Sequence, residues 1–216
     1  MGQSECGSDL KGSKDLQKRR GLPEQYAQVL KGDEGMVREV IRQLCRRTPE
    51  DGCCNYITSH TGFTLCDLVS YDGKHNEANG ERNQDGPDYN YSWNCGTEGP
   101  SRKRSVMTLR KNQMKNAFLL LLLSQGTPCI LAGDEFGNTQ DGNNNVYCQD
   151  NETAWLNWGR QKSYEDLFRF VKRLIALRKS NPVFHQRQAL LGLDRTACGI
   201  PDVSYHGEVH GRYRMQ

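Results

Sequence analysis

Two short β-prone runs constrain the fold of this chain more than any other feature. Residues 55–59 read NYITS and residues 129–132 read CILA, and each run follows a helical pattern and opens into a long polar loop. A third helical pattern follows the second loop. Strands that are separated by helices pair in parallel through a right-handed crossover. The order helix, strand, helix, strand, helix therefore predicts an α/β fold with two neighbouring parallel strands.

Three amphipathic segments supply the predicted helices. The first begins near Asp33, a residue type that caps helices, and the second runs from a capping Ser105 to about Ser124. The third begins at Ser163, where Asp166 allows a capping box with Asp in place of the usual Glu. The apolar residues expected to face the core are Met36, Val37, Val40, Ile41, Leu44 and Cys45, then Leu109, Ala117, Phe118, Leu121 and Leu122, then Phe168, Val171, Leu174 and Ile175.

Each predicted strand ends in a long polar loop, residues 60–104 after the first and 133–162 after the second. Both loops are rich in Asn, Gly and Asp, and both carry aromatic residues. A loop of such length in a compact domain is usually functional or disordered. In α/β folds, ligands bind the loops at the carboxyl ends of the strands. We therefore expect the two loops to form the site face.

Composition and charge argue against several classes of function. The formal net charge is +3, and the basic clusters at 11–20 and 102–104 lack the interleaved aromatic residues of a nucleic-acid reader. The longest apolar run, 117–123, is too short to cross a membrane. The nine cysteines lack the short paired spacing of a zinc site, so we expect no metal and no cofactor. Without a secretory leader, they indicate reduced thiols in a cytoplasmic protein.

Two stretches carry a resemblance to a known family. Residues 56–100 read YITSHTGFTLCDLVSYDGKHNEANGERNQDGPDYNYSWNCGTEGP, and residues 121–158 read LLLSQGTPCILAGDEFGNTQDGNNNVYCQDNETAWLNW. Both resemble the isoamylase and glycogen-debranching branch of the α-amylase glycoside hydrolase superfamily. With KGDEGMV at 31–37 and CGIPDVSYHGE at 198–208, the resemblance covers about residues 30–208.

The resemblance implies a partial (β/α)8 TIM barrel. The chain would hold the last two strands, the seventh and eighth, with flanking helices and long βα loops. Residues 1–29 would be a disordered or divergent lead-in, 30–182 the C-terminal part of the catalytic barrel, and 183–216 the truncated start of a C-terminal β domain. Both ends drift from the family, so we expect a truncated or frameshifted reading frame, or a segment cut from a longer protein.

The family chemistry needs three carboxylates, and this chain departs from that pattern. A retaining glycosidase uses one carboxylate as nucleophile and another as acid/base. The resemblance implies that these lie on the fourth and fifth strands, and the residues before 30 show no such motif. The third is an aspartate in the family sequence His-Asp-Gly-Phe-Thr-Leu, which here reads His60-Thr61-Gly62-Phe63-Thr64-Leu65. Thr61 offers a hydroxyl without a charge, so the catalytic set is incomplete.

Substrate contacts are predicted at His60, Asn143, Asn145 and Tyr147. His60 alone would more often be a structural histidine, but the surrounding motif favours a contact with sugar hydroxyls. Asn143 and Asn145 could shape turns or meet glucan hydroxyls, and their loop lacks the downstream Glu of an EF-hand calcium loop. For Asp134 and Glu135, hydrogen bonding to loop amides is favoured over acid/base work.

The sequence therefore predicts a fragment of a glycoside hydrolase that cleaves α-1,6 branch linkages of glycogen or a starch-like glucan by the retaining mechanism. The isolated chain is expected to be inactive, so whether it counts as an enzyme stays open. Branched α-glucan is the expected partner, and the missing half of the barrel is a second candidate. The alternative is a non-catalytic glucan-binding or partner-interaction module.

Overall fold

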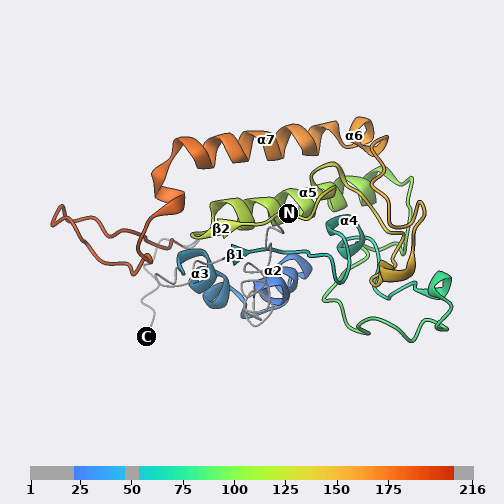
Figure 1. The fold of residues 1–216 in the computed structure, drawn as a ribbon. Helices are drawn as coiled ribbons and strands as arrows, with labels where there is room; N and C mark the ends of the chain where they lie inside the picture. The colour runs from blue at the N-terminus through green and yellow to red at the C-terminus, as the bar shows by residue number, and fades with distance from the viewer. Residues whose placement is uncertain (1–21, 47–53, 207–216) are drawn as a thin grey trace, which may run out of the picture.

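A computed structural model of the chain describes residues 22–46 and 54–206 (Figure 1). The remaining residues, which include most of the predicted lead-in and the end of the predicted β-domain segment, lie outside this range. The helices are α2 (Leu22–Lys31), α3 (Val37–Cys45), α4 (Leu65–Leu68), α5 (Arg104–Leu123), α6 (Arg160–Ser163) and α7 (Glu165–Ser180), and the 3-10 helices are η1 (Glu77–Asn79), η2 (Asp134–Phe136), η3 (Val146–Cys148) and η4 (Pro182–His185).

The sheet has two parallel strands, as predicted, but each is only two residues long. β1 (Cys54–Asn55) pairs with β2 (Thr127–Pro128), and the Cys129 N–H donates to the Asn55 carbonyl at 2.7 Å. The strand predicted at 129–132 is therefore wrong, because the paired residues come two positions earlier. Of the strand predicted at 55–59, only Asn55 is paired, and the observed strand begins one residue earlier, at Cys54. Among the described residues, β1 and β2 pair only with each other, so the sheet ends where these two strands diverge.

The predicted helices are present, but their caps differ from the prediction. α5 begins at Arg104 after Lys103, with no side-chain cap, so Ser105 lies within the helix. The capping box at Ser163 is also wrong, because α7 begins at Glu165 after an uncapped Tyr164. Asp166 instead pairs with lysines of α5, at 2.8 Å from Lys111 and 3.1 Å from Lys115. These ion pairs join the first turn of α7 to α5.

The N-terminal part of the described chain is more helical than the sequence indicated. α2 covers residues 22–29 of the predicted disordered or divergent lead-in. The next helix, α3, begins at Val37 rather than near Asp33, and the Met36 side chain gives it no cap. At the other end, residues 186–206 contain no helix or strand, so a β-domain start at 183 remains a prediction.

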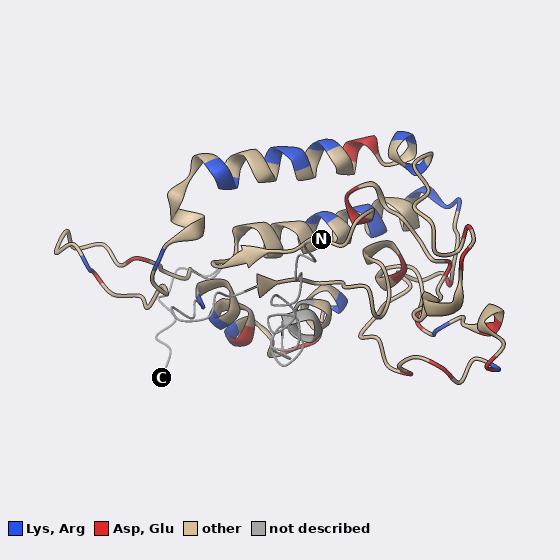
Figure 2. Cartoon of the chain, in the orientation of Figure 1, with Lys and Arg blue, Asp and Glu red and all other residues tan. Residues whose placement is uncertain are grey.

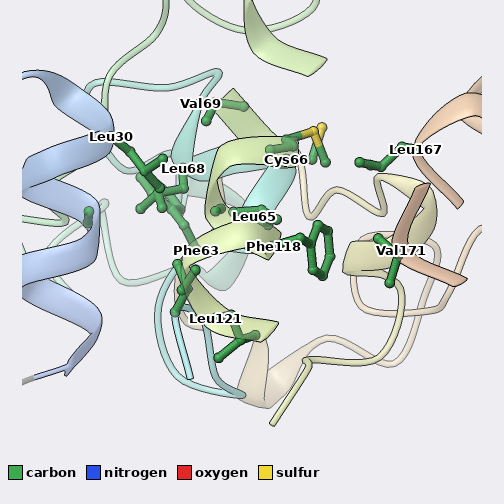
Figure 3. Close-up of a cluster of buried hydrophobic side chains, with 14 of the residues drawn as sticks. Leu30, Phe63, Leu65, Cys66, Leu68, Val69, Phe118, Leu121, Leu167 and Val171 are labelled. Carbon is green, nitrogen blue, oxygen red and sulfur yellow. The ribbon is translucent and has the colours of Figure 1, made fainter. Parts of the chain in front are cut away.

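The core lies where α5 passes between α4 and α7. Figure 3 shows Phe118 and Leu121 of α5 with Leu65 of α4 on one side and Leu167 and Val171 of α7 on the other. Two predicted core residues are outside it, since Val37 is 72% exposed and Leu109 is also exposed. The buried residues of α3, α5 and α7 are Val40, Gln43, Cys45, Arg110, Met114, Ala117, Phe118, Leu121, Leu122, Leu167, Val171, Leu174 and Arg178.

The two long loops lie at the same end of the molecule, as the parallel strands require. In Figure 1 the loop after β1, with α4, and the loop after β2 are both at the right, whereas residues 186–206 project at the left. Figure 2 shows acidic residues in these loops and basic residues spread along α7, α5 and α3. No helix in the described part of the chain is long and apolar enough to span a membrane.

A buried arginine of α7 holds the end of α5. The Arg178 guanidinium donates to the carbonyls of Leu122 and Ser124, both at 2.7 Å, and to that of Gly126. The last carbonyls of a helix have no partner within the helix. Arg178 therefore supplies donors to carbonyls at the end of α5 and just beyond it.

We expect Arg178→Met to lower the free energy of unfolding by about 3 kcal/mol, because it removes three hydrogen bonds from a buried guanidinium to backbone carbonyls. The matched control is Arg173→Met, which removes an exposed arginine from the same helix and should change stability by no more than about 0.5 kcal/mol. Urea unfolding followed by circular dichroism measures both. Equal losses in the two variants would contradict the role assigned to Arg178.

Candidate functional site

A buried carboxylate, that of Asp67, joins the two long loops. Asp67 is 0% exposed, and it accepts hydrogen bonds from the Thr64 hydroxyl at 2.9 Å and from the Gln140 N–H at 2.8 Å, together with the Thr139 hydroxyl. Thr64 is also the N-cap of α4 and accepts from the Asp67 N–H. Burial raises the pKa of Asp67 to about 6, although these donors oppose the rise.

A second buried carboxylate, that of Asp134, holds the segment after β1 against η2. It accepts from the Leu65 N–H at 2.9 Å and from the Thr58 hydroxyl, and burial raises its pKa to about 7. The adjacent Glu135 accepts from the Gly133 N–H at 3.0 Å. The structural interpretation of Asp134 and Glu135, as acceptors from loop amides, is therefore confirmed.

Asparagine side chains form a third connection between the loops. The Asn144 N–H donates to the Asn76 side-chain oxygen at 3.0 Å, and the Asn76 amide donates back to the Asn144 side-chain oxygen at 2.8 Å. The Asn144 side-chain amide also donates to Asn90 at 2.8 Å, and its carbonyl accepts from the Gly62 N–H at 3.0 Å. Asn144 thus fixes Gly62, whose φ of 97° requires glycine, beside Thr61.

The predicted contacts Asn143 and Asn145 lie in the same network. Asn143 is 1% exposed, and its amide donates to the Asn79 oxygen at 2.8 Å while its own oxygen accepts from the Asn145 N–H at 2.9 Å. The Asn145 amide donates to the Asp85 carboxylate at 2.9 Å. These contacts support turn shaping for Asn143, whereas the half-buried Asn145 side-chain oxygen accepts no hydrogen bond from any described residue.

Thr61 lines a cavity at the end of the segment after β1. The cavity has a volume of about 220 Å³ and is bounded by residues 56–59, Thr61, Gly62 and Phe63, by Ala27 and Leu68, and by Asn90 and Tyr91 of the long loop. The Thr61 hydroxyl lies 3.2 Å from the Ser59 hydroxyl. Among the described residues of this lining none carries a carboxylate, and the groups they offer are hydroxyls, an amide and aromatic rings.

The other predicted contacts lie outside this cavity. His60 is exposed and is not part of the lining, and its side chain makes no hydrogen bond to any described residue. Tyr147, in η3, is 70% exposed. The structure therefore brings Thr61 together with Asn90 and Tyr91, which sequence reasoning did not select. The alternating aromatic residues Tyr89, Tyr91 and Trp93 were the sequence signal that could have indicated this part of the loop.

A further residue that the sequence did not indicate holds the end of the first long loop. Arg110 of α5 is buried, and its guanidinium donates to the carbonyls of Gly99 at 2.7 Å and Asn94 at 3.0 Å. Within the described ranges, no three His, Cys, Asp or Glu residues are placed to hold a metal ion. The described lining of the Thr61 cavity thus offers hydroxyl, amide and aromatic groups, which suit a polar neutral molecule.

Curated relatives match this chain over a limited segment. The glycogen operon protein GlgX homolog of Mycobacterium bovis is 53% identical over 138 residues, which is 64% of this chain and 19% of the relative. Isoamylase 1, chloroplastic, of Arabidopsis thaliana is 52% identical over 125 residues, 57% of this chain and 16% of the relative. Glycogen debranching enzyme of Dickeya chrysanthemi is 51% identical over 132 residues, which is 61% of this chain and 20% of the relative. The chain thus matches a fifth or less of each relative's length.

A solved structure shares the fold of this segment, although no family model matches the chain. Pullulanase from Anoxybacillus sp. LM18-11, complexed with maltotetraose, superposes with a TM-score of 0.52 at 24% identity, over 74% of this chain and 20% of the pullulanase. At this identity the likeness shows the fold alone. The identity near 50% with the named relatives shows that the matched segment is homologous to part of the glycogen debranching enzymes and isoamylases.

Proposed function

We propose that this chain forms the last two strands and the adjoining loops of a (β/α)8 barrel that cleaves α-1,6 branch linkages of glycogen or a starch-like glucan by the retaining mechanism. The relatives named for glycogen debranching and isoamylase support the reaction, and the pullulanase complexed with maltotetraose supports an α-glucan ligand. The parallel order of β1 and β2, with both loops at one end, supports the barrel placement.

The surroundings of Thr61 carry one part of the proposal, the inactivity of the isolated chain, because no described residue that lines this cavity is acidic. The chemistry needs a nucleophile and an acid/base roughly 5–5.5 Å apart. Asp67 and Asp134, which lie outside the described lining of this cavity, are buried with both carboxylate oxygens occupied by protein donors. We therefore expect the isolated chain to bind glucan without cleaving it.

The rest of the barrel is the partner that this arrangement needs. The sheet has two strands, and a closed barrel requires eight. Six further strands, from the same or another polypeptide, would supply the nucleophile and the acid/base and would cover the open edges of β1 and β2. All seven cysteines in the described ranges are free thiols, which supports a cytoplasmic location.

A non-catalytic glucan-binding module is the second candidate. The site face keeps its loop contacts through neutral amides and buried carboxylates, and none of these contacts involves the Thr61 side chain. Binding could therefore persist where chemistry is lost. The two candidates differ in whether the loops become active when the missing strands are supplied.

A chimera separates these candidates. The matched segment of the Dickeya chrysanthemi glycogen debranching enzyme would be replaced by that of this chain, once with Thr61 and once with Thr61→Asp. We expect the Thr61→Asp chimera to debranch glycogen and the Thr61 chimera to be slower by about a hundredfold or more, since one charge-assisted contact in the transition state is worth about 3 kcal/mol. The rate of reducing-end release from glycogen measures both.

Equal rates in the two chimeras would contradict the importance of the missing charge. An inactive Thr61→Asp chimera that is folded by circular dichroism would contradict the placement of this segment in a debranching barrel, and would favour the binding module.

The isolated 216-residue chain should release no reducing ends from glycogen, because the nucleophile and the acid/base are missing. The Thr61→Asp variant should be equally inactive, since it restores only the third carboxylate. Both proteins should nevertheless be retarded in a native gel that contains glycogen. Hydrolysis by either isolated protein, above a control without protein, would overturn the proposal.

The raised pKa of Asp134 predicts a fall in stability as pH rises. The folded state holds its proton up to a pH of about 7, whereas an unfolded aspartate loses it near pH 4, so the unfolded state binds fewer protons between these values. The stabilising contribution is therefore fully present below about pH 4 and is lost as pH rises through about 7. Asp67 acts in the same direction up to a pH of about 6.

We expect Asp134→Asn to reduce the slope of unfolding free energy against pH, by at most about 1.4 kcal/mol per pH unit between pH 4 and 7. Urea unfolding at half-unit pH intervals measures the slope. Glu152→Gln, which removes an exposed carboxylate from the same loop, serves as the control and should leave the slope unchanged. The same slope in wild type and Asp134→Asn would show that Asp134 is not buried as described.

A further inference from the structure

A cavity beside the first half of α5 brings two arginines together. It has a volume of about 200 Å³ and lies between α4, residues 99–101 at the end of the first long loop, α5, and the segment that holds α6. Arg110 of α5 and Arg160 of α6 both line it, and we call it the Arg110–Arg160 cavity. Its described lining shares no residue with that of the Thr61 cavity, so it is a separate candidate site.

The Arg110 guanidinium is a buried cation without an acidic partner. Arg110 is 4% exposed, and its two terminal nitrogens donate to backbone carbonyls, among them those of Gly99 and Asn94. Its Nε–H is also buried and donates to no described residue. Carbonyl oxygens satisfy hydrogen bonds but carry no net charge, and a buried charge is costly unless a counter-ion lies near it. The described residues supply Arg110 with no ion pair, so its charge favours an anion in the cavity.

Arg160 adds a second guanidinium that has a donor to spare. This residue is half-buried, and its Nε–H donates to the Gly137 carbonyl at 2.5 Å. One terminal nitrogen lies 3.3 Å from the Tyr164 hydroxyl and 3.4 Å from the Cys66 sulfur. The other terminal nitrogen donates to no described residue, and no described carboxylate pairs with Arg160. A planar guanidinium with free N–H groups matches the geometry of phosphate oxygens.

The other groups of the lining leave the positive charge in excess. Asp141, which is exposed, is the one acidic residue of the described lining. Burial raises the pKa of the Tyr164 hydroxyl and of the Cys66 thiol, so both keep their protons at neutral pH and add no negative charge. The hydroxyls of Ser70 and Ser101 are further donors. Two guanidinium groups and one carboxylate leave one net positive charge, which favours an anion.

We infer that the Arg110–Arg160 cavity is a phosphate-binding site, which takes inorganic phosphate or the phosphate group of a small ester such as a sugar monophosphate. The phosphate oxygens accept from Arg160 and from the hydroxyls, and the negative charge compensates the buried Arg110. A bound phosphate connects the end of the first long loop to α6. The inference does not depend on glycoside hydrolysis, because no group in this lining belongs to the Thr61 cavity.

Calorimetric titration of the 216-residue chain with inorganic phosphate, at fixed ionic strength, tests this site. Wild type should bind with a Kd of about 1 mM or below. Arg160→Met should weaken binding by about tenfold or more, because it removes a charge-assisted hydrogen bond. The matched control Arg173→Met removes an exposed arginine of α7 and should leave the affinity unchanged. Circular dichroism checks that each variant is folded.

Asp141→Asn gives a change of the opposite sign. It removes the negative charge from the lining and should tighten phosphate binding by about threefold. The backbone φ of 52° at this position is left-handed, and asparagine adopts that conformation as readily as aspartate does. Weaker phosphate binding in Asp141→Asn than in wild type would contradict the role assigned to charge.

Titrations with glucose 6-phosphate and with glucose distinguish the two sources of the phosphate group. Tighter binding of glucose 6-phosphate than of inorganic phosphate identifies an ester as the ligand, and the reverse order identifies free phosphate. Either order supports the site, provided that Arg160→Met weakens both. Any affinity for glucose should be equal in wild type and Arg160→Met, because glucose has no phosphate group.

Folded wild type that binds neither phosphate compound at about 10 mM would rule out the site, as would equal phosphate affinity in wild type and Arg160→Met. The proposed function is tested separately, because reducing-end release by the Thr61→Asp chimera requires no phosphate. Failure of one test therefore leaves the other result standing.

Discussion

Buried hydrogen bonds between the two long loops hold the site face together. The sheet cannot do so, since β1 and β2 contribute two residues each. Asp67 instead accepts from both loops, Asp134 ties the start of α4 to η2, and Asn144 is bonded to Asn76 and Asn90. The carboxylate oxygens of Asp67 and Asp134 all accept hydrogen bonds, which avoids the cost of a buried charged group without a partner. Thr61, Asn90 and Tyr91 take their positions from this framework.

Sequence periodicity was sufficient for the order of elements but not for their ends. The apolar repeat of α5 and α7 reports burial along a whole helix, so those helices were predicted within a few residues. Caps depend on single contacts, and Asp166 binds Lys111 of α5 rather than its own helix start. Strand length depends on neighbouring strands, which the runs at 55–59 and 129–132 do not encode. Arg110 and Arg178 bind carbonyls far away in sequence, which no local pattern can indicate.

The site was predicted in part for the same reason. The motif around His60 located the start of the first long loop and drew attention to Thr61, although β1 ends earlier, at Asn55. The partners of Thr61 could not be found in this way, since Asn90 and Tyr91 come from about thirty residues further along. For Asn143 the sequence left two roles open, turn shaping and contact with glucan hydroxyls. The hydrogen bond from its amide to Asn79 supports turn shaping, and a local pattern could not reveal this partner.

Perturbed acids are usually a sign of a functional site, and here their geometry argues otherwise. Burial raises the pKa of both Asp67 and Asp134, but each carboxylate has protein donors on both oxygens, which leaves no position for a substrate. Catalysis requires a charge that faces the reacting atoms, whereas loop geometry requires only that each buried group be paired. The two requirements fall on different residues in this chain. Under the proposed function, Thr61 supplies no charge to the chemistry, whereas the hydrogen bonds that join the two loops do not involve the Thr61 side chain.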